Sequence, residues 1–342
     1  MMLDTPKPIR TGEELPDIVL NQYFQKHDLP QITSITQFPS GFSNLTYCIH
    51  TQEGDIVLRR APFGAQAKGG HNMEREYRIS EGIYPYYQKI PKPIHCCTNP
   101  EIIGSSFYLM ERVKGLIVRK NNALHPPDVY RKLSKESAIE LARIHSIPKH
   151  VLPDLGKPTG YVARQISGWI RRHEKAKTIE LPGMDELSLW LHKHQPQDQG
   201  NQIIHNDYKY DNLILHQDTF DIKAVLDWEM TTRGCPLMDL GVSLGYWLEK
   251  TDNPALQALP FCPTHLDGNF TRQEFMEAYA KERNITIHTP NYYIVYGVWR
   301  LIIILEQIYK RYVLGHTQDQ RFGLLGKALP ILVDHAQKLQ KL

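Results

Sequence analysis

The residues best suited to do chemistry lie in one short stretch, IIHNDYKYDNLIL. It places His205, Asp207, Lys209 and Asn212 between two apolar runs, and a further apolar run, IKAVL, leads to Asp227 in the string DWE. Apolar runs of this length are typical of short buried strands. We therefore expect a polar loop held by rigid strands, with its side chains at fixed distances.

The side chains of this loop suit the transfer of a phosphoryl group to a hydroxyl. Asn212 and Asp227 carry hard oxygen atoms, which Mg²⁺ prefers together with water and substrate phosphates. Asp207 can then orient and deprotonate the attacking hydroxyl. His205 and Lys209 complete the candidate catalytic set. We favour an orienting role for His205, while Lys209 either steadies the transferred phosphate or is a surface lysine.

Composition limits the kinds of partner. The 342 residues are 41% hydrophobic and 23% charged, which is ordinary for a globular protein. A formal charge of +3 predicts neither a nucleic-acid nor a membrane partner. Five scattered cysteines without a CxxC pair indicate reduced thiols and a cytoplasmic protein. The beginning of the chain lacks the apolar core of a secretion signal, and the run LIIIL is too short to span a bilayer.

The pattern of predicted elements changes near residue 113. Short β-like runs occupy residues 45–50, 56–59 and 106–110, with helical signals at the beginning of the chain and around residues 73–81. Beyond residue 113 the periodicity is mainly helical and is interrupted by the two strands that hold the polar loop. The sequence thus predicts a small lobe that mixes strands and helices, followed by a larger helical lobe.

The spacing His205-x-Asp207-x-x-x-x-Asn212, followed by a hairpin and Asp227, resembles the motif of the aminoglycoside phosphotransferase and choline kinase superfamily, relatives of protein kinases. The wider string HNDYKYDNLIL…VLDWEMTTRGCPLMDLG most resembles the bacterial branch that is similar to the kinase-like domain of certain acyl-CoA dehydrogenases. The resemblance extends from about Phe38 to the last long helix.

This resemblance implies a bilobal, protein-kinase-like α+β fold. Residues 1–113 would form an N-terminal nucleotide-binding lobe with an antiparallel sheet, and residues 114–342 a larger, mainly helical lobe for catalysis and substrate binding. It also implies ATP or GTP and Mg²⁺ as cofactors.

The resemblance assigns a phosphate-binding pair. The string IVLRR places Arg59 where kinases carry a lysine that contacts phosphate, and NMEREYRI places Glu76 where its partner carboxylate lies. Arginine is a departure from the family pattern, although it can bind phosphate through a forked pair of hydrogen bonds. A surface ion pair is the alternative.

Further nucleotide contacts follow from two other strings. SGFSNLTY resembles the turn that covers the phosphates, and FYLMERVKG resembles the link between lobes, whose backbone would meet the adenine edge. The implied residues are Gly41, Ser43, Asn44, Glu111 and Val113.

Two other positions depart from the family, and a third matches it. Asn206 stands where the family usually has glycine, and Cys235 where it often has aspartate. Asparagine adopts positive φ more readily than most residues, so we expect the loop to form. Asp239 matches the aspartate that braces the catalytic loop, and His145 is expected to be a core histidine.

The acceptor is not identified by the sequence. We expect it beside Asp207, near residues 160–191 and the late helices. Tyr292, Tyr296, Trp299 and Arg300 are candidates to line its pocket. A hydroxyacyl thioester or an amino alcohol is favoured over an aminoglycoside, because no dense acidic run is present to bind a polycation. A group of basic residues could meet an anionic acceptor, although a solvated helix face is favoured. These are Arg164, Arg171, Arg172, Lys175 and Lys177.

The prediction is therefore an ATP-dependent phosphotransferase acting on the hydroxyl of a small molecule. Two alternatives remain open. One is a nucleotide-binding pseudokinase that regulates a partner protein, and the other is a nucleotidyl transferase. The sequence does not predict an oligomeric state.

Overall fold

A computed structural model describes residues 5–39, 44–62, 71–120, 125–157, 159–198, 200–259, 261–317 and 319–341. The chain divides into two compact units. The first comprises Met1–Ile117 and Asn212–Thr231, and the second comprises Val118–Asp211 and Thr232–Leu342. Each unit is described separately below.

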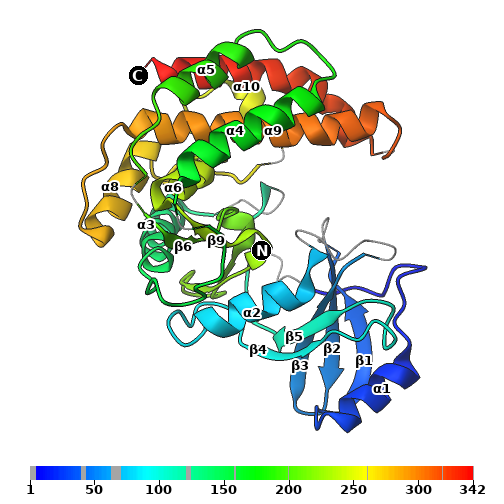
Figure 1. Cartoon of the computed structure of the whole chain (residues 1–342). Coiled ribbons are helices and arrows are strands. Elements are labelled where there is room, and N and C mark those ends of the chain that lie inside the picture. The colour runs from blue at the N-terminus through cyan, green and yellow to red at the C-terminus, as the bar shows by residue number, and fades with distance from the viewer. Residues whose placement is uncertain are drawn as a thin grey trace. The chain divides into compact units, whose positions relative to one another are not determined.

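The first unit is built on a five-stranded antiparallel sheet with strand order β1-β2-β3-β5-β4 (Figure 1). Side chains alternate between its two faces, as expected of β-strands. On β2, for example, Tyr47 and Ile49 face the main core, while Cys48 belongs to a smaller cluster with Phe38 and Val57. The strands are β1 (Ile32–Gln37), β2 (Leu45–Thr51), β3 (Gly54–Arg60), β4 (Pro93–Cys97) and β5 (Phe107–Glu111).

Two helices belong to this unit. Helix α1 (Asp17–Lys26) inserts Leu20 and Phe24 into the main core under the sheet. Helix α2 (Met73–Ile83) begins at Asn72, whose side chain accepts the backbone N–H of Arg75 at 2.9 Å. An N-cap of this kind stabilises a helix by about 1 kcal/mol. It also fixes the first turn of α2, which carries Glu76.

A hairpin far along the chain completes the first unit. It consists of β7 (Leu213–Leu215) and β8 (Ile222–Val225), followed by the 3₁₀ turn η4 (Trp228–Met230). Leu116 forms a bridge with Leu215 through backbone hydrogen bonds of 2.9 and 2.8 Å. A single boundary after residue 113 was predicted from the sequence. In the structure the first unit extends to Ile117 and also includes this hairpin, because the backbone and apolar side chains of the hairpin pack there.

The second unit is mainly helical. Figure 1 shows the long helix α9 alongside α4 and α10, and α9 also packs against α5 and α6. The short strands β6 (Gln202–Ile204) and β9 (Thr232–Gly234) pair in antiparallel fashion beside these helices. The remaining elements are α3 (Pro127–Ile144), α4 (Tyr161–Ala176), α5 (Met184–Lys193), η3 (Tyr210–Asn212), α6 (Pro236–Gly245), α7 (Pro254–Gln257), α8 (Arg272–Arg283), α9 (Pro290–Val313), η5 (Gln320–Leu324) and α10 (Leu325–Gln340).

Close backbone contact fixes α6 against α9. A Cβ atom at Gly241 would overlap the carbonyl oxygen of Tyr293, and a Cβ atom at Gly297 would overlap that of Gly241. Only glycine permits this approach. The contact sets the positions of Asp239 on α6 and Arg300 on α9, two residues that hold the loop after β6.

The predicted fold class is confirmed, since an antiparallel sheet is followed by a mainly helical region. The predicted strands at residues 45–50, 56–59 and 106–110 and the helix at residues 73–81 correspond to β2, β3, β5 and α2. None of the helices that the structure describes is both long and apolar enough to cross a membrane. All five cysteines are free thiols, as their spacing predicted.

Candidate active site

Arg59 on β3 is the centre of an ionic cluster in the first unit. Its Nη1 lies 3.2 Å from Oε1 of Glu76 on α2, and its Nη2 lies 2.6 Å from Oδ1 of Asp227 and 3.0 Å from Oε2 of Glu229. The Arg59 side chain is 12% exposed. Burial disfavours its charge, but Glu76 and Asp227 hold the pKa of Arg59 above its ordinary value. The predicted pair of Arg59 and Glu76 is therefore a buried contact rather than a surface one.

Glu76 lies on the buried face of α2. The phenolic hydroxyl of Tyr108 on β5 donates to Glu76 Oε1 at 3.0 Å. Burial raises the pKa of Glu76, and Arg59 opposes this shift. Met73, Ile79 and Ser80 share the buried face with Glu76, whereas Tyr77 is half-buried.

Asp227 is presented by an unusual backbone conformation. It follows β8, precedes η4 and has φ = 68°. Aspartate is one of the few side chains that adopt this left-handed conformation readily. Two residues later Glu229 accepts a hydrogen bond from the amide of Asn44 at 2.7 Å. Arg75 donates to the backbone carbonyls of Glu229 and Thr231, which fixes this turn against α2.

The composition of the Arg59 cluster fits a divalent cation and a phosphate group. Three carboxylates share the Arg59 guanidinium, so oxygen donors exceed the positive charge that neutralises them. Arg59 Nε and Glu76 Oε2 are buried without a hydrogen-bond partner among the residues that the structure describes. Buried polar atoms are usually paired, and exceptions often mark binding sites. Carboxylate oxygens are the ligands that Mg²⁺ prefers.

In the second unit, the loop after β6 is anchored to Asp239. The Asp239 carboxylate accepts the backbone N–H groups of His205 and Asn206, each at 2.7 Å, and lies 3.0 Å from His145 Nε2. His145 Nδ1 is 2.7 Å from the hydroxyl of Tyr279. The predictions for Asp239 as a brace and His145 as a satisfied core residue are confirmed. Burial opposes ionisation of Asp239, but His145 holds its pKa below the ordinary value.

Asn206 accommodates the tight loop as predicted. Its φ is 66°, the conformation that glycine would adopt freely. The hydroxyl of Tyr161 donates to its side-chain oxygen at 3.2 Å. Arg300 donates to its carbonyl oxygen at 3.1 Å.

Asp207 and Lys209 form a pair beyond this turn. Lys209 Nζ lies 3.0 Å from each carboxylate oxygen of Asp207, and both side chains are 21% exposed. Burial lowers the pKa of Lys209, but Asp207 and Tyr246 more than offset this and keep it above the ordinary value. His205 is fully buried, and its Nδ1 accepts the backbone N–H of Asp207 at 3.2 Å. This geometry suits His205 to positioning Asp207.

Two arginines lie against Trp169 in the second unit. The guanidinium of Arg172 lies 4.6 Å from the ring centroid, and that of Arg300 lies 5.2 Å from it. Arg300 is the one that reaches the Asn206 carbonyl, next to Asp207. The other basic residues of α4 and the following residue Lys177 are exposed, which agrees with a solvated face.

The remaining predicted residues have the following positions. Asn212 is buried at the end of η3, directly before β7, and its carbonyl accepts the N–H of Leu226 at 2.8 Å. Glu111 ends β5 and donates its N–H to Lys92, and Val113 packs in a small apolar cluster with Ile117, Ile214 and Ala224. Gly41 and Ser43 lie outside the described residues.

Several site residues were not singled out from the sequence. Glu229 is the last residue of the string DWE, and its position two residues after Asp227 was the only local indication of a role in the site. Tyr108 carries no local signal, because its contact with Glu76 depends on sheet register. Asp211 lies half-buried beside Cys262, and desolvation raises its pKa.

Comparison with known proteins adds independent information. The model described as "Phosphotransferase enzyme family" matches residues 34–262. Acyl-CoA dehydrogenase family member 10 of Mus musculus is 31% identical over 94% of this chain and 31% of its own length. The chain thus spans less than half the length of the curated acyl-CoA dehydrogenase relatives that it matches.

Solved structures share the fold. A protein of Ralstonia eutropha, provisionally described as an aminoglycoside phosphotransferase, is 26% identical with a TM-score of 0.77, covering 95% of this chain and 99% of the other. The GDP complex of wild-type aminoglycoside 2'-phosphotransferase-IIIa is 13% identical with a TM-score of 0.63, covering 94% and 99%.

Proposed function

This chain belongs to the phosphotransferase enzyme family, and from that membership we propose that it transfers the γ-phosphoryl group of ATP or GTP to a hydroxyl group of a small metabolite. The observation that carries the proposal is the buried cluster of Arg59 with Glu76, Asp227 and Glu229. Such a cluster supplies both a phosphate-binding guanidinium and carboxylate oxygens for a metal.

The proposed roles follow from the chemistry of each side chain. Arg59, held by Glu76, binds phosphate oxygens. Asn212 and Asp227 would hold Mg²⁺, and the bound ion would neutralise the negative charge of the phosphates. Asp207 accepts the proton of the acceptor hydroxyl. The hydroxyl oxygen forms a bond to the γ-phosphorus, and the bond from that phosphorus to the nucleoside diphosphate breaks. The Lys209 ammonium group contacts Asp207 and is suited to stabilise the negative charge of the transferred phosphoryl group.

We propose an acceptor that carries no positive charge, and favour a hydroxyacyl thioester. Asp207 contacts Lys209, and the neighbouring residue Asn206 contacts Arg300. A polycationic aminoglycoside would meet like charges there, whereas the phosphates of a coenzyme A thioester would be attracted. The names of the acyl-CoA dehydrogenase relatives support the same class of substrate, although they describe much longer chains.

Thermal unfolding with nucleotide tests the binding part of the proposal. A ligand at 100 times its dissociation constant should stabilise the native protein by about 2.7 kcal/mol. We expect ATP or GTP with Mg²⁺ to raise the melting temperature of the wild type. The Mg²⁺-dependent part of this shift should be absent in Asp227→Asn and preserved in Asp218→Asn, which changes an exposed aspartate of the same hairpin. No shift with either nucleotide would overturn the proposal.

Product analysis separates the proposed reaction from its alternatives. Incubation with hydroxyacyl thioesters, amino alcohols and aminoglycosides should yield a nucleoside diphosphate and a phosphorylated acceptor. Pyrophosphate as a product would instead indicate nucleotidyl transfer. Nucleotide binding with no turnover of any acceptor would favour a regulatory pseudokinase.

A further inference from the structure

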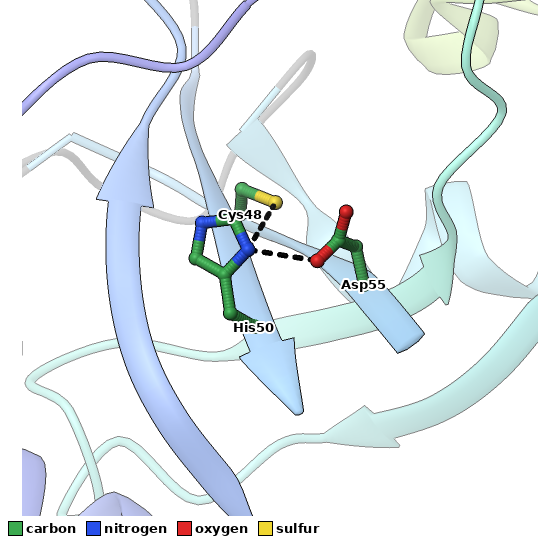
Figure 2. A group of neighbouring side chains, drawn as sticks. All are labelled: Cys48, His50 and Asp55. Carbon is green, nitrogen blue, oxygen red and sulfur yellow. Dashed lines mark hydrogen bonds and ion pairs between the residues drawn. The ribbon is translucent and has the colours of Figure 1, made fainter. Parts of the chain in front are cut away.

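A cysteine, a histidine and an aspartate converge on one face of the sheet in the first unit. Cys48 and His50 are two residues apart on β2, so their side chains point to the same face. Asp55 on β3 is the direct cross-strand partner of His50. Figure 2 shows the three side chains facing one another across the two strands. The proposed phosphotransferase mechanism uses none of the three.

The geometry is that of a chelating group. His50 Nδ1 lies 2.7 Å from Asp55 Oδ1 and 3.9 Å from Cys48 Sγ, and the three donor atoms lie within 4.8 Å of one another. In a tetrahedral zinc site, bond lengths of about 2.0 to 2.3 Å separate such atoms by roughly 3.3 to 3.7 Å. Small side-chain adjustments therefore suffice to place an ion among them.

A catalytic relay is a poorer explanation of this arrangement. In a cysteine–histidine–aspartate triad the thiol and the carboxylate contact opposite nitrogens of the imidazole ring. Here both Cys48 and Asp55 face Nδ1, and Nε2 is 2.8 Å from the hydroxyl of Thr36. Proteins usually orient a metal-binding histidine through a hydrogen bond at the ring nitrogen that does not bind the metal, which here would be Nε2.

The surroundings of Asp55 leave one of its oxygens for a metal. Arg112 and Lys114 lie 2.7 and 2.9 Å from Oδ2, whereas Oδ1 faces His50. Contact with these two cations favours the ionised form of the Asp55 carboxylate, the form that binds a metal. The two cations oppose a metal ion electrostatically. Lys114 is 66% exposed and can turn into solvent, which relieves part of this repulsion.

We propose that Cys48, His50 and Asp55 bind one thiophilic divalent metal ion, best suited to Zn²⁺, with water as the fourth ligand. A mixed sulfur, nitrogen and oxygen donor set favours Zn²⁺, whereas Mg²⁺ prefers oxygen ligands alone. The site is thus chemically distinct from the carboxylate cluster around Arg59. Metal binding here would connect β2 to β3 and order the face of the sheet that Thr36 and Arg112 border.

Metal titration of the purified full chain without nucleotide tests this proposal. After removal of metals with a chelator, Zn²⁺ should bind with a stoichiometry of one in competition with a chromophoric chelator. Co²⁺ in the same site should give the near-ultraviolet absorption of a cobalt–thiolate bond. Cys48→Ser should abolish that absorption and weaken Zn²⁺ binding by at least the 10- to 100-fold cost typical of losing even an outer-shell partner.

Two further variants make the result decisive. His50→Gln alters a half-buried side chain and should weaken Zn²⁺ binding to a similar extent, which guards against misfolding of Cys48→Ser. Cys96→Ser changes a free thiol on β4 and should leave binding intact. Absence of stoichiometric binding, or equal loss in Cys96→Ser, would overturn the site. Because nucleotide is omitted, neither outcome bears on phosphoryl transfer.

Discussion

The Arg59 cluster of the first unit and the Asp239 cluster of the second unit are built on opposite charge patterns. In the first unit, one guanidinium is surrounded by three carboxylates. In the second, the single carboxylate of Asp239 is surrounded by two backbone N–H groups and His145. The Asp239 cluster is buried and the Arg59 cluster is partly buried, so hydrogen bonding must offset the cost of removing their charges from water.

This difference in charge indicates which cluster binds a ligand and which one positions a loop. The Asp239 cluster is saturated with donors, which suits a permanent brace. The Arg59 cluster has more carboxylate oxygen than positive charge and contains buried atoms without partners among the described residues. Such an excess is stabilised when a cation binds, so we assign ligand binding to the Arg59 cluster and loop positioning to the Asp239 cluster.

The largest expected effect concerns Asp207, the proposed base, which lies in the loop anchored by the Asp239 cluster. Asp207→Asn removes the proposed base and should lower turnover by about 10² to 10⁴-fold, the usual contribution of general base catalysis. Nucleotide affinity should change little, because Asp207 lies outside the Arg59 cluster. Steady-state kinetics with the acceptor identified by product analysis would measure this split.

A matched substitution controls for nonspecific loss of activity. Asp218→Asn alters an exposed aspartate and should retain wild-type turnover. Equal turnover in Asp207→Asn and the wild type would show that a different group accepts the proton.

The next effect concerns the charge of the Arg59 cluster. Arg59→Met leaves three carboxylates without their guanidinium, and removing one partner of a buried ion pair costs about 3 to 5 kcal/mol. Millimolar Mg²⁺ should restore part of this loss by replacing the missing positive charge. Chemical denaturation with and without Mg²⁺, at constant ionic strength, would measure the rescue.

The saturated cluster supplies the contrasting case. Asp239→Asn leaves one backbone N–H facing an amide donor and should lower the free energy of unfolding by about 1 to 3 kcal/mol. Mg²⁺ should not restore this loss, because the Asp239 cluster has no surplus oxygen donors. If Mg²⁺ stabilised both variants equally, the proposed division between the clusters would be wrong.

The sequence predicted the parts of the site that local spacing determines. The spacing from His205 to Asn212 and the position of Asp239 are properties of single segments, and the structure confirms the loop anchored by Asp239. The three β-like runs of the small lobe were predicted because each contains a short apolar stretch, and the structure buries three consecutive residues in each.

The sequence could not predict contacts that depend on register or on distant elements. Tyr108 reaches Glu76 only because β5 pairs with β3, and Glu229 joins Arg59 across 170 positions of the chain. The return of residues 212–231 to the first unit has the same origin, because a bridge between Leu116 and Leu215 leaves no local pattern. Strands β1 and β4 were not among the predicted runs, since most of their side chains are exposed or half-buried.

The two clusters should also respond to pH with opposite signs. The folded-state pKa of Asp239 is lowered from 3.8, so its stabilising contribution is present above that pH and is lost as the pH falls toward the lowered value. The folded-state pKa of Glu76 is raised from 4.5, so the folded state binds its proton more tightly. The contribution of Glu76 to stability is therefore lost as the pH rises through the raised value.

Variant-minus-wild-type stabilities isolate these two contributions. The cost of Asp239→Asn should shrink as the pH falls below 3.8. Relative to the wild type, Glu76→Gln should become more stable as the pH rises above 4.5. Denaturant titrations across this range would measure both slopes, and slopes of the same sign would contradict the assigned directions.

The smallest expected effect compares the two left-handed residues, one in each cluster. Asn206 and Asp227 have φ of 66° and 68°. Asn206→Gly keeps the backbone bonds to Asp239 and Arg300 and loses the Tyr161 contact, so its stability should stay within about 1 kcal/mol of the wild type. Asn206→Ala should be less stable than Asn206→Gly by about 1 to 2 kcal/mol, the cost of a left-handed conformation for most residues.

Activity then distinguishes the two turns. Asn206→Gly should retain turnover, because the proposed reaction gives the side chain of Asn206 no role. Asp227→Gly permits the same φ but removes the carboxylate, so the Mg²⁺-dependent stabilisation by nucleotide should be lost. If Asn206→Gly abolished turnover while remaining as stable as the wild type, the Asn206 side chain would itself take part in the reaction, and the second unit would supply more than a brace for Asp207.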